Sequence, residues 1–136
     1  MVDVTAINYW AILGAAAANM VLGFLWYGPL FGKKWMELSG MTMDKMKSMK
    51  TTPAQGYVMA FIGALVMAYI LVFFIGSANA ITLQQRLMTG FWIWLGFFAT
   101  KSLGSVTWEG KPLSLYFLNN AYDLLSILAM AAILTF

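Results

Sequence analysis

Two ionisable residues, Lys101 and Asp123, lie inside otherwise apolar stretches and offer the sequence's clearest potential for chemistry. A charged group within a bilayer costs about 3 kcal/mol or more, so such groups usually face a partner or a water-filled cavity. A short turn separates the two stretches, which predicts antiparallel neighbouring helices with the lysine able to reach toward the carboxylate. Such a pair could handle a proton, an ion or a charged solute.

Uncharged polar residues extend this pair into a predicted intramembrane polar cluster. Around Asp123 they recur at spacings of three and four, which places them on one side of a helix. Asn19 joins them from the equivalent point of the first apolar stretch. The predicted cluster consists of Asn19, Lys101, Asn119, Asn120, Asp123 and Ser126.

The cluster admits two interpretations. In the structural one, Lys101 extends toward the cytoplasmic surface, and Asp123 is protonated or hydrogen-bonded, joining helices. In the functional one, the polar residues line a cavity and act on a transported species. The structural interpretation is favoured because one acid and one base can neutralise each other.

Composition argues against most enzyme classes. The chain has no histidine, no cysteine and five acidic residues, which leaves little from which to build a catalytic or metal site. We therefore expect no enzyme activity, no metal and no cofactor. The net charge of +3 comes mainly from lysines gathered in one loop, so we interpret it as a topology signal and expect no nucleic-acid partner.

The elements that position these residues are predicted to be membrane-spanning helices. The chain is 62% hydrophobic and 10% charged, against about 25% charged in soluble domains. Four apolar stretches of about 20 residues can each cross roughly 30 Å of hydrocarbon as a helix. We predict an all-α polytopic membrane protein, one domain over 1–136, with spans Ile7–Trp26, Gln55–Ile75, Leu87–Val106 and Leu113–Phe136.

The loop 30–53 sets the predicted orientation. It contains five lysines, and lysine-rich short loops stay in the cytoplasm. We therefore expect a multi-pass protein of the cell (inner) membrane with this loop cytoplasmic and both termini on the other side. Methionines at helical spacing beside the lysines predict a short interfacial helix held by anionic lipid headgroups; they are Met43, Met46 and Met49.

An internal duplication is predicted from matching residues 82 positions apart. At this offset Trp26 falls on Trp108 and Gly28 on Gly110, and a Pro-Leu pair follows each. The copies would be 5–76, with 30–53 inserted, and 84–136. Each would be a helical hairpin starting outside, so the two form parallel repeats about an axis along the membrane normal.

Tryptophans near the ends of the predicted spans suit the headgroup region. We expect Trp26, Trp35 and Trp108 to be interfacial anchors. Gly and Pro in the two Trp-containing turns would end one helix and start the next.

Small residues recur every four positions in three of the spans. Gly56, Ala60, Ala64 and Ala68 form one such series, and Gly96, Thr100 and Gly104 another. Small residues at this spacing let helix backbones approach closely in lipid. Because such series on three helices exceed what one four-helix bundle needs, we expect a homo-oligomer.

Three segments resemble a known family. They are the run from Trp26 to Met36 with Leu38-Ser39-Gly40, the run Gly90–Phe97, and the stretch from Trp108 to Asn119. Together they resemble the domain of unknown function 1761 family of small bacterial membrane proteins. The resemblance implies a four-helix integral membrane protein and supplies no activity.

The sequence thus predicts a structural or accessory membrane protein that acts through helix packing and oligomerisation, with the lipid bilayer as its surroundings. The alternative is a small transporter or channel-like pore for an ion, proton or small solute, using the Asp123–Lys101 pair.

Overall fold

The structure, a computed structural model, describes residues 6–134, and this part of the chain is helical with no strand. The long helices are α1 (Tyr9–Leu25), α4 (Pro53–Ser77) and α7 (Leu113–Ile133). With the turn that follows α1, the three helical stretches Tyr9–Leu30, Pro53–Ser77 and Leu113–Ile133 are long and apolar enough to cross a membrane. Phe136, the predicted end of the last span, lies outside the described residues.

The predicted span Leu87–Val106 is a helical segment with interruptions. It comprises α5 (Leu83–Ile93), a π-helix η3 (Trp94–Ala99), a 3-10 turn η4 (Lys101–Leu103) and α6 (Gly104–Thr107). Its start is earlier than predicted because Thr82 and Gln85 form a reciprocal capping box, which satisfies free amides of the first turn. The four-helix count therefore stays a prediction.

A second π-helix, η2 (Trp26–Leu30), extends α1. Pro29 lies inside it and has no amide hydrogen to donate, and the amide of Phe31 instead donates to the carbonyl of Trp26 at 2.8 Å. The sequence predicts that Gly28 ends the helix, and the structure carries it on to Leu30. Only the second turn follows the expectation, because Gly110 has a left-handed φ of +69°.

The loop 30–53 folds into two short helices, α2 (Gly32–Ser39) and α3 (Met43–Lys47). Gly40 ends α2 in a left-handed conformation, and the Thr42 side chain accepts a hydrogen bond from the amide of Lys45 at the start of α3. Helix α3 is exposed at every position, whereas most positions of α2 are half-buried. The loop thus contains two short helices where the sequence predicts one interfacial helix.

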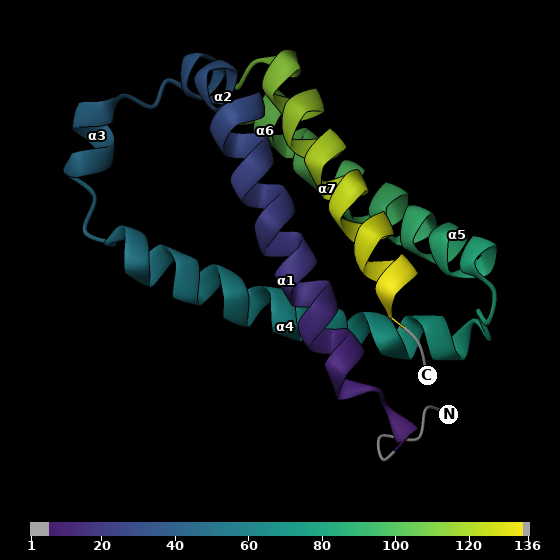
Figure 1. Cartoon of the computed structure of the whole chain (residues 1–136). Coiled ribbons are helices and arrows are strands. Elements are labelled where there is room, and N and C mark those ends of the chain that lie inside the picture. The colour runs from purple at the N-terminus through teal and green to yellow at the C-terminus, as the bar shows by residue number, and fades with distance from the viewer. Residues whose placement is uncertain (1–5, 135–136) are drawn as a thin grey trace.

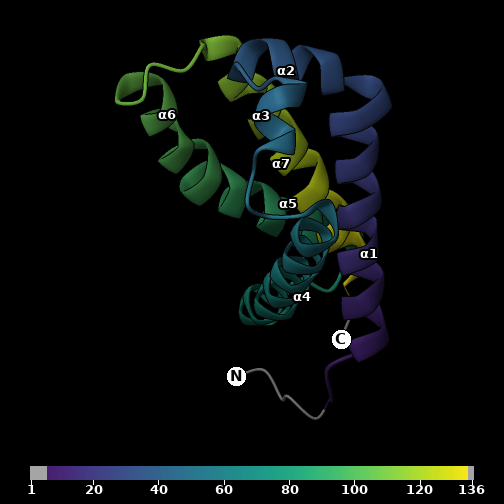
Figure 2. The ribbon, with the colours of Figure 1, turned by 90° about the vertical axis from the view of Figure 1, so that its left-hand side faces the viewer.

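Helices α1, α5–α6 and α7 run side by side, while α4 crosses them (Figures 1 and 2). The start of α1 and the end of α7 lie at one end of the molecule, near the crossing. The turns after α1 and after α6 lie together at the other end (Figure 1). The two halves therefore continue differently: α7 returns beside α6, whereas α2 and α3 carry the chain away before α4.

The apolar core lies where α4 crosses the other helices. One face of the C-terminal half of α4 is buried there, against α1 and the end of α7. The N-terminal half of α4 projects beyond the crossing (Figure 1) and is mostly exposed. Core residues of the crossing include Ile12, Ala15, Ala68, Leu71, Val72, Ile75, Ile127, Met130 and Ala131.

Candidate functional site: a polar cluster around α7

Asn19 on α1 and two residues of α7 form the central part of the cluster. The Asn19 side-chain oxygen accepts hydrogen bonds from the Ser126 hydroxyl and from the Tyr122 hydroxyl, the latter at 3.1 Å. The Tyr122 hydroxyl also lies 3.0 Å from the backbone oxygen of Asn19. Residues 122 and 126 are one turn apart, so both reach the same point of α1.

The π-helix after α1 makes a second connection to α7. The Tyr27 hydroxyl donates to the Asn119 side-chain oxygen at 2.8 Å, and the Trp26 indole donates to the carbonyl of Leu118 at 3.2 Å. The ring of Tyr122 lies edge-on to that of Tyr27, with 5.2 Å between centroids. The residues of this turn therefore join α1 to α7 as well as end α1.

On its other side, α7 is joined to the interrupted helix, the segment from α5 to α6 (83–107). The Asn120 amide nitrogen donates to the Ser102 hydroxyl at 2.8 Å, and that hydroxyl lies 3.1 Å from the Asn120 side-chain oxygen. The Trp94 indole donates to the carbonyl of Asn120 at 2.9 Å, and the Tyr116 hydroxyl to that of Ala99 at 2.7 Å. Asn120 and Ser126 are buried.

Hydroxyl groups satisfy carbonyls along the interrupted helix itself. Ser102 donates to the carbonyl of Phe98 at 2.7 Å, and Thr100 to that of Gly96 at 2.6 Å. An irregular helix needs such substitute partners for backbone groups that are shielded from water. Across the described residues, every buried side-chain nitrogen or oxygen has a hydrogen-bond partner.

Lys101 and Asp123 do not meet. Lys101 is exposed and Asp123 is half-buried, and within residues 6–134 no ion pair joins them. The expectation of a pair assumed a regular helix up to Lys101. The π-helical and 3-10 turns at 94–103 change the rotation per residue, which turns the lysine outward. Asp123 instead lies on α7 directly after Tyr122, whose hydroxyl is bonded to Asn19.

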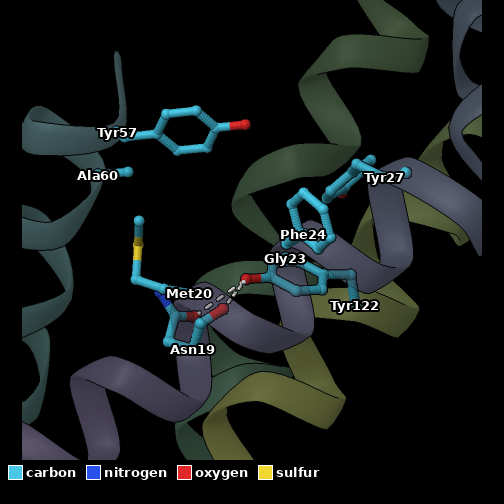
Figure 3. A pocket seen from close by; sticks show the side chains of 9 residues that line it. Asn19, Met20, Gly23, Phe24, Tyr27, Tyr57, Ala60 and Tyr122 are labelled. Carbon is cyan, nitrogen blue, oxygen red and sulfur yellow. Dashed lines mark hydrogen bonds between the residues drawn. The ribbon is translucent and has the colours of Figure 1, made fainter. Parts of the chain in front are cut away.

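A cavity of about 320 Å³ lies between α1, α4 and α7 (Figure 3). Its floor is the hydrogen-bonded pair of Asn19 and Tyr122, and Tyr57 of α4 faces them from the opposite wall (Figure 3). The cavity is lined by Asn19, Met20, Gly23, Phe24, Tyr27, Gly28, Tyr57, Ala60 and Tyr122.

The three tryptophans predicted as anchors have different surroundings. Trp26 is half-buried against α7, and Trp35 lies 6.1 Å, centroid to centroid, from the ring of Tyr27. Trp108 is 90% exposed. Packing within the protein therefore accounts for Trp26 and Trp35, whereas for Trp108 the interfacial anchor remains the prediction.

Sequence reasoning missed Arg86. Its guanidinium donates to the carbonyls of Ala131 at 3.1 Å and Ala132 at 3.3 Å, near the end of α7, and to that of Ile81 at 2.7 Å. A cation at a helix C-terminus stabilises the unpaired carbonyls there. The sequence also gave no indication of Tyr27, Trp94 and Ser102, or of the bond from Tyr122 to Asn19. The spacing of Tyr122 and Ser126 along α7 was the available signal.

The residues described contain no group of three or more His, Cys, Asp or Glu side chains that could hold a metal ion. No curated protein and no solved structure matches the sequence. A family model described as protein of unknown function (DUF1761) matches residues 10–135. The match covers nearly the entire chain, and the chain therefore belongs to the DUF1761 family.

Proposed function

We propose that this protein is a structural or accessory protein of the cell (inner) membrane, acting through helix packing and homo-oligomerisation. The observation that carries the proposal is the use of its polar side chains. Asn19, Asn119, Asn120 and Ser126 all take part in hydrogen bonds that join α7 to α1 or to the interrupted helix. Polar groups that are hydrogen-bonded to each other in this way hold helices together in lipid, which favours a packing role over a conduction path.

The proposed topology has four spans, with α5–α6 as the third and the others as α1, α4 and α7. The two turns at one end of the molecule and the chain's first and last described residues at the other support it (Figure 1). The lysines of α2 and α3 follow the first turn, which favours a cytoplasmic position for that end and an outer position for both termini. We retain the duplicated hairpin as part of this proposal on the sequence match alone.

The loop 30–53 is proposed to lie against anionic headgroups. Met43, Met46 and Met49 are exposed, at 58%, 43% and 54%, beside exposed lysines in and after α3. Exposed apolar side chains mixed with cations favour an interfacial position.

The outer face of α4 supports association between copies. Gly56, Met59, Gly63, Val66 and Ile70 recur at spacings of three and four on the side opposite Ala64, Ala68 and Ile75. A Cβ added at Gly56 or Gly63 would meet no atom within 4 Å. The chain itself therefore leaves room for a second helix at both glycines.

Light scattering on the purified protein in maltoside micelles tests the proposal. We expect a homo-oligomer, and we expect the double change Gly56→Leu with Gly63→Leu to give a monomer with unchanged thermal unfolding. Ala121→Leu is the matched control, because Ala121 is also a small exposed residue and lies on another helix, α7, outside these series. A monomeric parent protein would contradict the proposal. So would a proton or ion flux in proteoliposomes that Asp123→Asn abolishes.

A further inference from the structure

The cavity between α1, α4 and α7 is walled by aromatic rings that come from all three helices. Phe24 and Tyr27 belong to α1 and its π-helical turn, Tyr57 to α4 and Tyr122 to α7. Figure 3 shows the Tyr57 ring on the α4 side, opposite Phe24, Tyr27 and Tyr122. The face of an aromatic ring carries negative potential, and several rings around one space form a site for a cation.

The hydrogen bonds at the wall fix the polarity of the cavity. Tyr27 donates its hydroxyl hydrogen to Asn119, and Tyr122 donates its own to Asn19. The hydroxyl oxygens of Tyr27 and Tyr122 therefore have only lone pairs left to present to the cavity. None of the nine lining residues is Lys or Arg. The cavity is therefore suited to a positive group and poorly suited to an anion.

Asp123 supplies the charge. It follows Tyr122 directly on α7 and lies outside the nine lining residues, and among residues 6–134 no cation forms an ion pair with it. Arg86 is occupied with carbonyls at the end of α7, and Lys101 is exposed on the interrupted helix. A carboxylate at membrane depth without a cationic partner attracts a cation from outside the chain.

We infer that this cavity binds an organic cation of the quaternary-ammonium class, with the rings of Phe24, Tyr27, Tyr57 and Tyr122 around the cation and Asp123 as its counter-charge. A quaternary ammonium group has no hydrogen to donate, so aromatic faces and a nearby negative charge are the contacts it can use. The volume of about 320 Å³ admits such a group with its substituents. The same chemistry occurs in free solutes such as choline and in the headgroups of choline lipids.

Ligand-observed NMR on the full chain in maltoside micelles tests this inference with choline and its neutral isostere 3,3-dimethylbutan-1-ol. We expect choline to bind and the isostere to bind at least about tenfold more weakly, which is the order of one shielded cation–π contact. Equal binding of the two probes, or no binding of choline, would overturn the inference.

Variants identify the site. Tyr57→Leu removes a ring from a residue that is 58% exposed, so the fold should persist while choline affinity falls about tenfold. Tyr57→Phe keeps the ring and should keep the affinity, and Asp123→Asn should abolish binding. Met59→Leu, on the same helix and outside the cavity lining, is the control. Undiminished binding in both Tyr57→Leu and Asp123→Asn would place the choline elsewhere and overturn the inference.

A further arm distinguishes the two sources of the cation. Adding phosphatidylcholine to the micelles displaces choline if a lipid headgroup enters the cavity, and leaves choline bound if only a free solute does. Either result supports a quaternary-ammonium site. The inference is independent of the proposed packing role, because an oligomer can form whether or not the cavity is occupied.

Discussion

Asn120 of α7 and Ser102 of the interrupted helix face each other with their amide nitrogen and hydroxyl oxygen 2.8 Å apart. Asn120 is buried, and its amide nitrogen also lies 2.9 Å from the carbonyl of Tyr116. The same hydroxyl donates to the carbonyl of Phe98 in the π-helix. One side-chain pair therefore both joins two helices and satisfies the backbone of an irregular turn.

Tryptophans at the two turns should respond differently to substitution. Trp26→Phe removes the indole donor to Leu118. It should lower the free energy of unfolding by about 0.6 kcal/mol, the average for interhelical hydrogen bonds in membranes, and by at most about 1.7 kcal/mol. Trp108→Phe should leave that free energy unchanged, since Trp108 is 90% exposed. Unfolding by denaturing detergent measures both, and equal losses would argue against the assigned contact.

Replacing Gly90 or Gly96 of the interrupted helix by leucine should have different effects on stability. A Cβ at Gly90 would lie 3.4 Å from the Ala131 side chain and 3.4 Å from the carbonyl oxygen of Ile127, whereas Gly96 has open space. Gly90→Leu should destabilise the protein by about 1–3 kcal/mol through overpacking, and Gly96→Leu should not. Thermal unfolding in micelles is the readout; a tolerated Gly90→Leu would mean that α5 and α7 pack less closely.

Asp123→Asn should keep or raise the stability of the fold. Asp123 forms no ion pair within the part of the chain described, and a neutral amide avoids the cost of a charge in the bilayer, about 3 kcal/mol at its centre. The measurement is the unfolding midpoint beside that of Asn120→Leu, which should fall because a buried, bonded amide is lost. An Asp123→Asn protein that unfolds as readily as Asn120→Leu would show an unrecognised structural contact of the carboxylate.

The proposed four-span topology can be mapped with single cysteines, because the chain has none of its own. In right-side-out and inside-out vesicles, a membrane-impermeant maleimide should label Ser48→Cys and Glu109→Cys only from the cytoplasmic face. Ser77→Cys should label only from the opposite face. Labelling of Ser48→Cys and Ser77→Cys from one side would show that α4 does not cross.

Much of the helical architecture could be predicted from apolar length. The spans around α1, α4 and α7 and the short turn at Trp108–Pro112 follow from stretches of hydrophobic residues and from Gly110. Even the early start of α5 had a readable signal, the Thr82–Gln85 capping box.

Other features depend on contacts that the sequence does not reveal. The π-helix at Trp94–Ala99 contains neither proline nor a polar run. The carbonyl of Ala99 is bonded by Tyr116 of α7, and those of Gly96 and Phe98 by the hydroxyls of Thr100 and Ser102, which follow the π-helix. Hydroxyls also bond carbonyls of the preceding turn in regular helices, so these two residues do not single out a π-helix. This break is also why Lys101 does not reach Asp123. The crossing of α4 over α1 likewise follows from packing of small and branched residues that periodicity alone cannot orient.

Within the candidate site, the sequence identified the amides and Ser126 but missed the aromatic donors. Asn19 and Ser126 were visible as polar residues in apolar surroundings, whereas Tyr122 and Trp94 resemble ordinary membrane aromatics until their partners are known. Every residue has a backbone carbonyl, so the type of the accepting residue does not indicate such a hydrogen bond.

A double-mutant cycle on Asn120 and Ser102 tests most directly whether the polar cluster holds the helices together. The free energy of unfolding is measured for Asn120→Ala, Ser102→Ala, the double variant and the parent protein. We predict a coupling energy of about 0.6 kcal/mol between the two positions, and at most about 1.7 kcal/mol. Losses that simply add would contradict it.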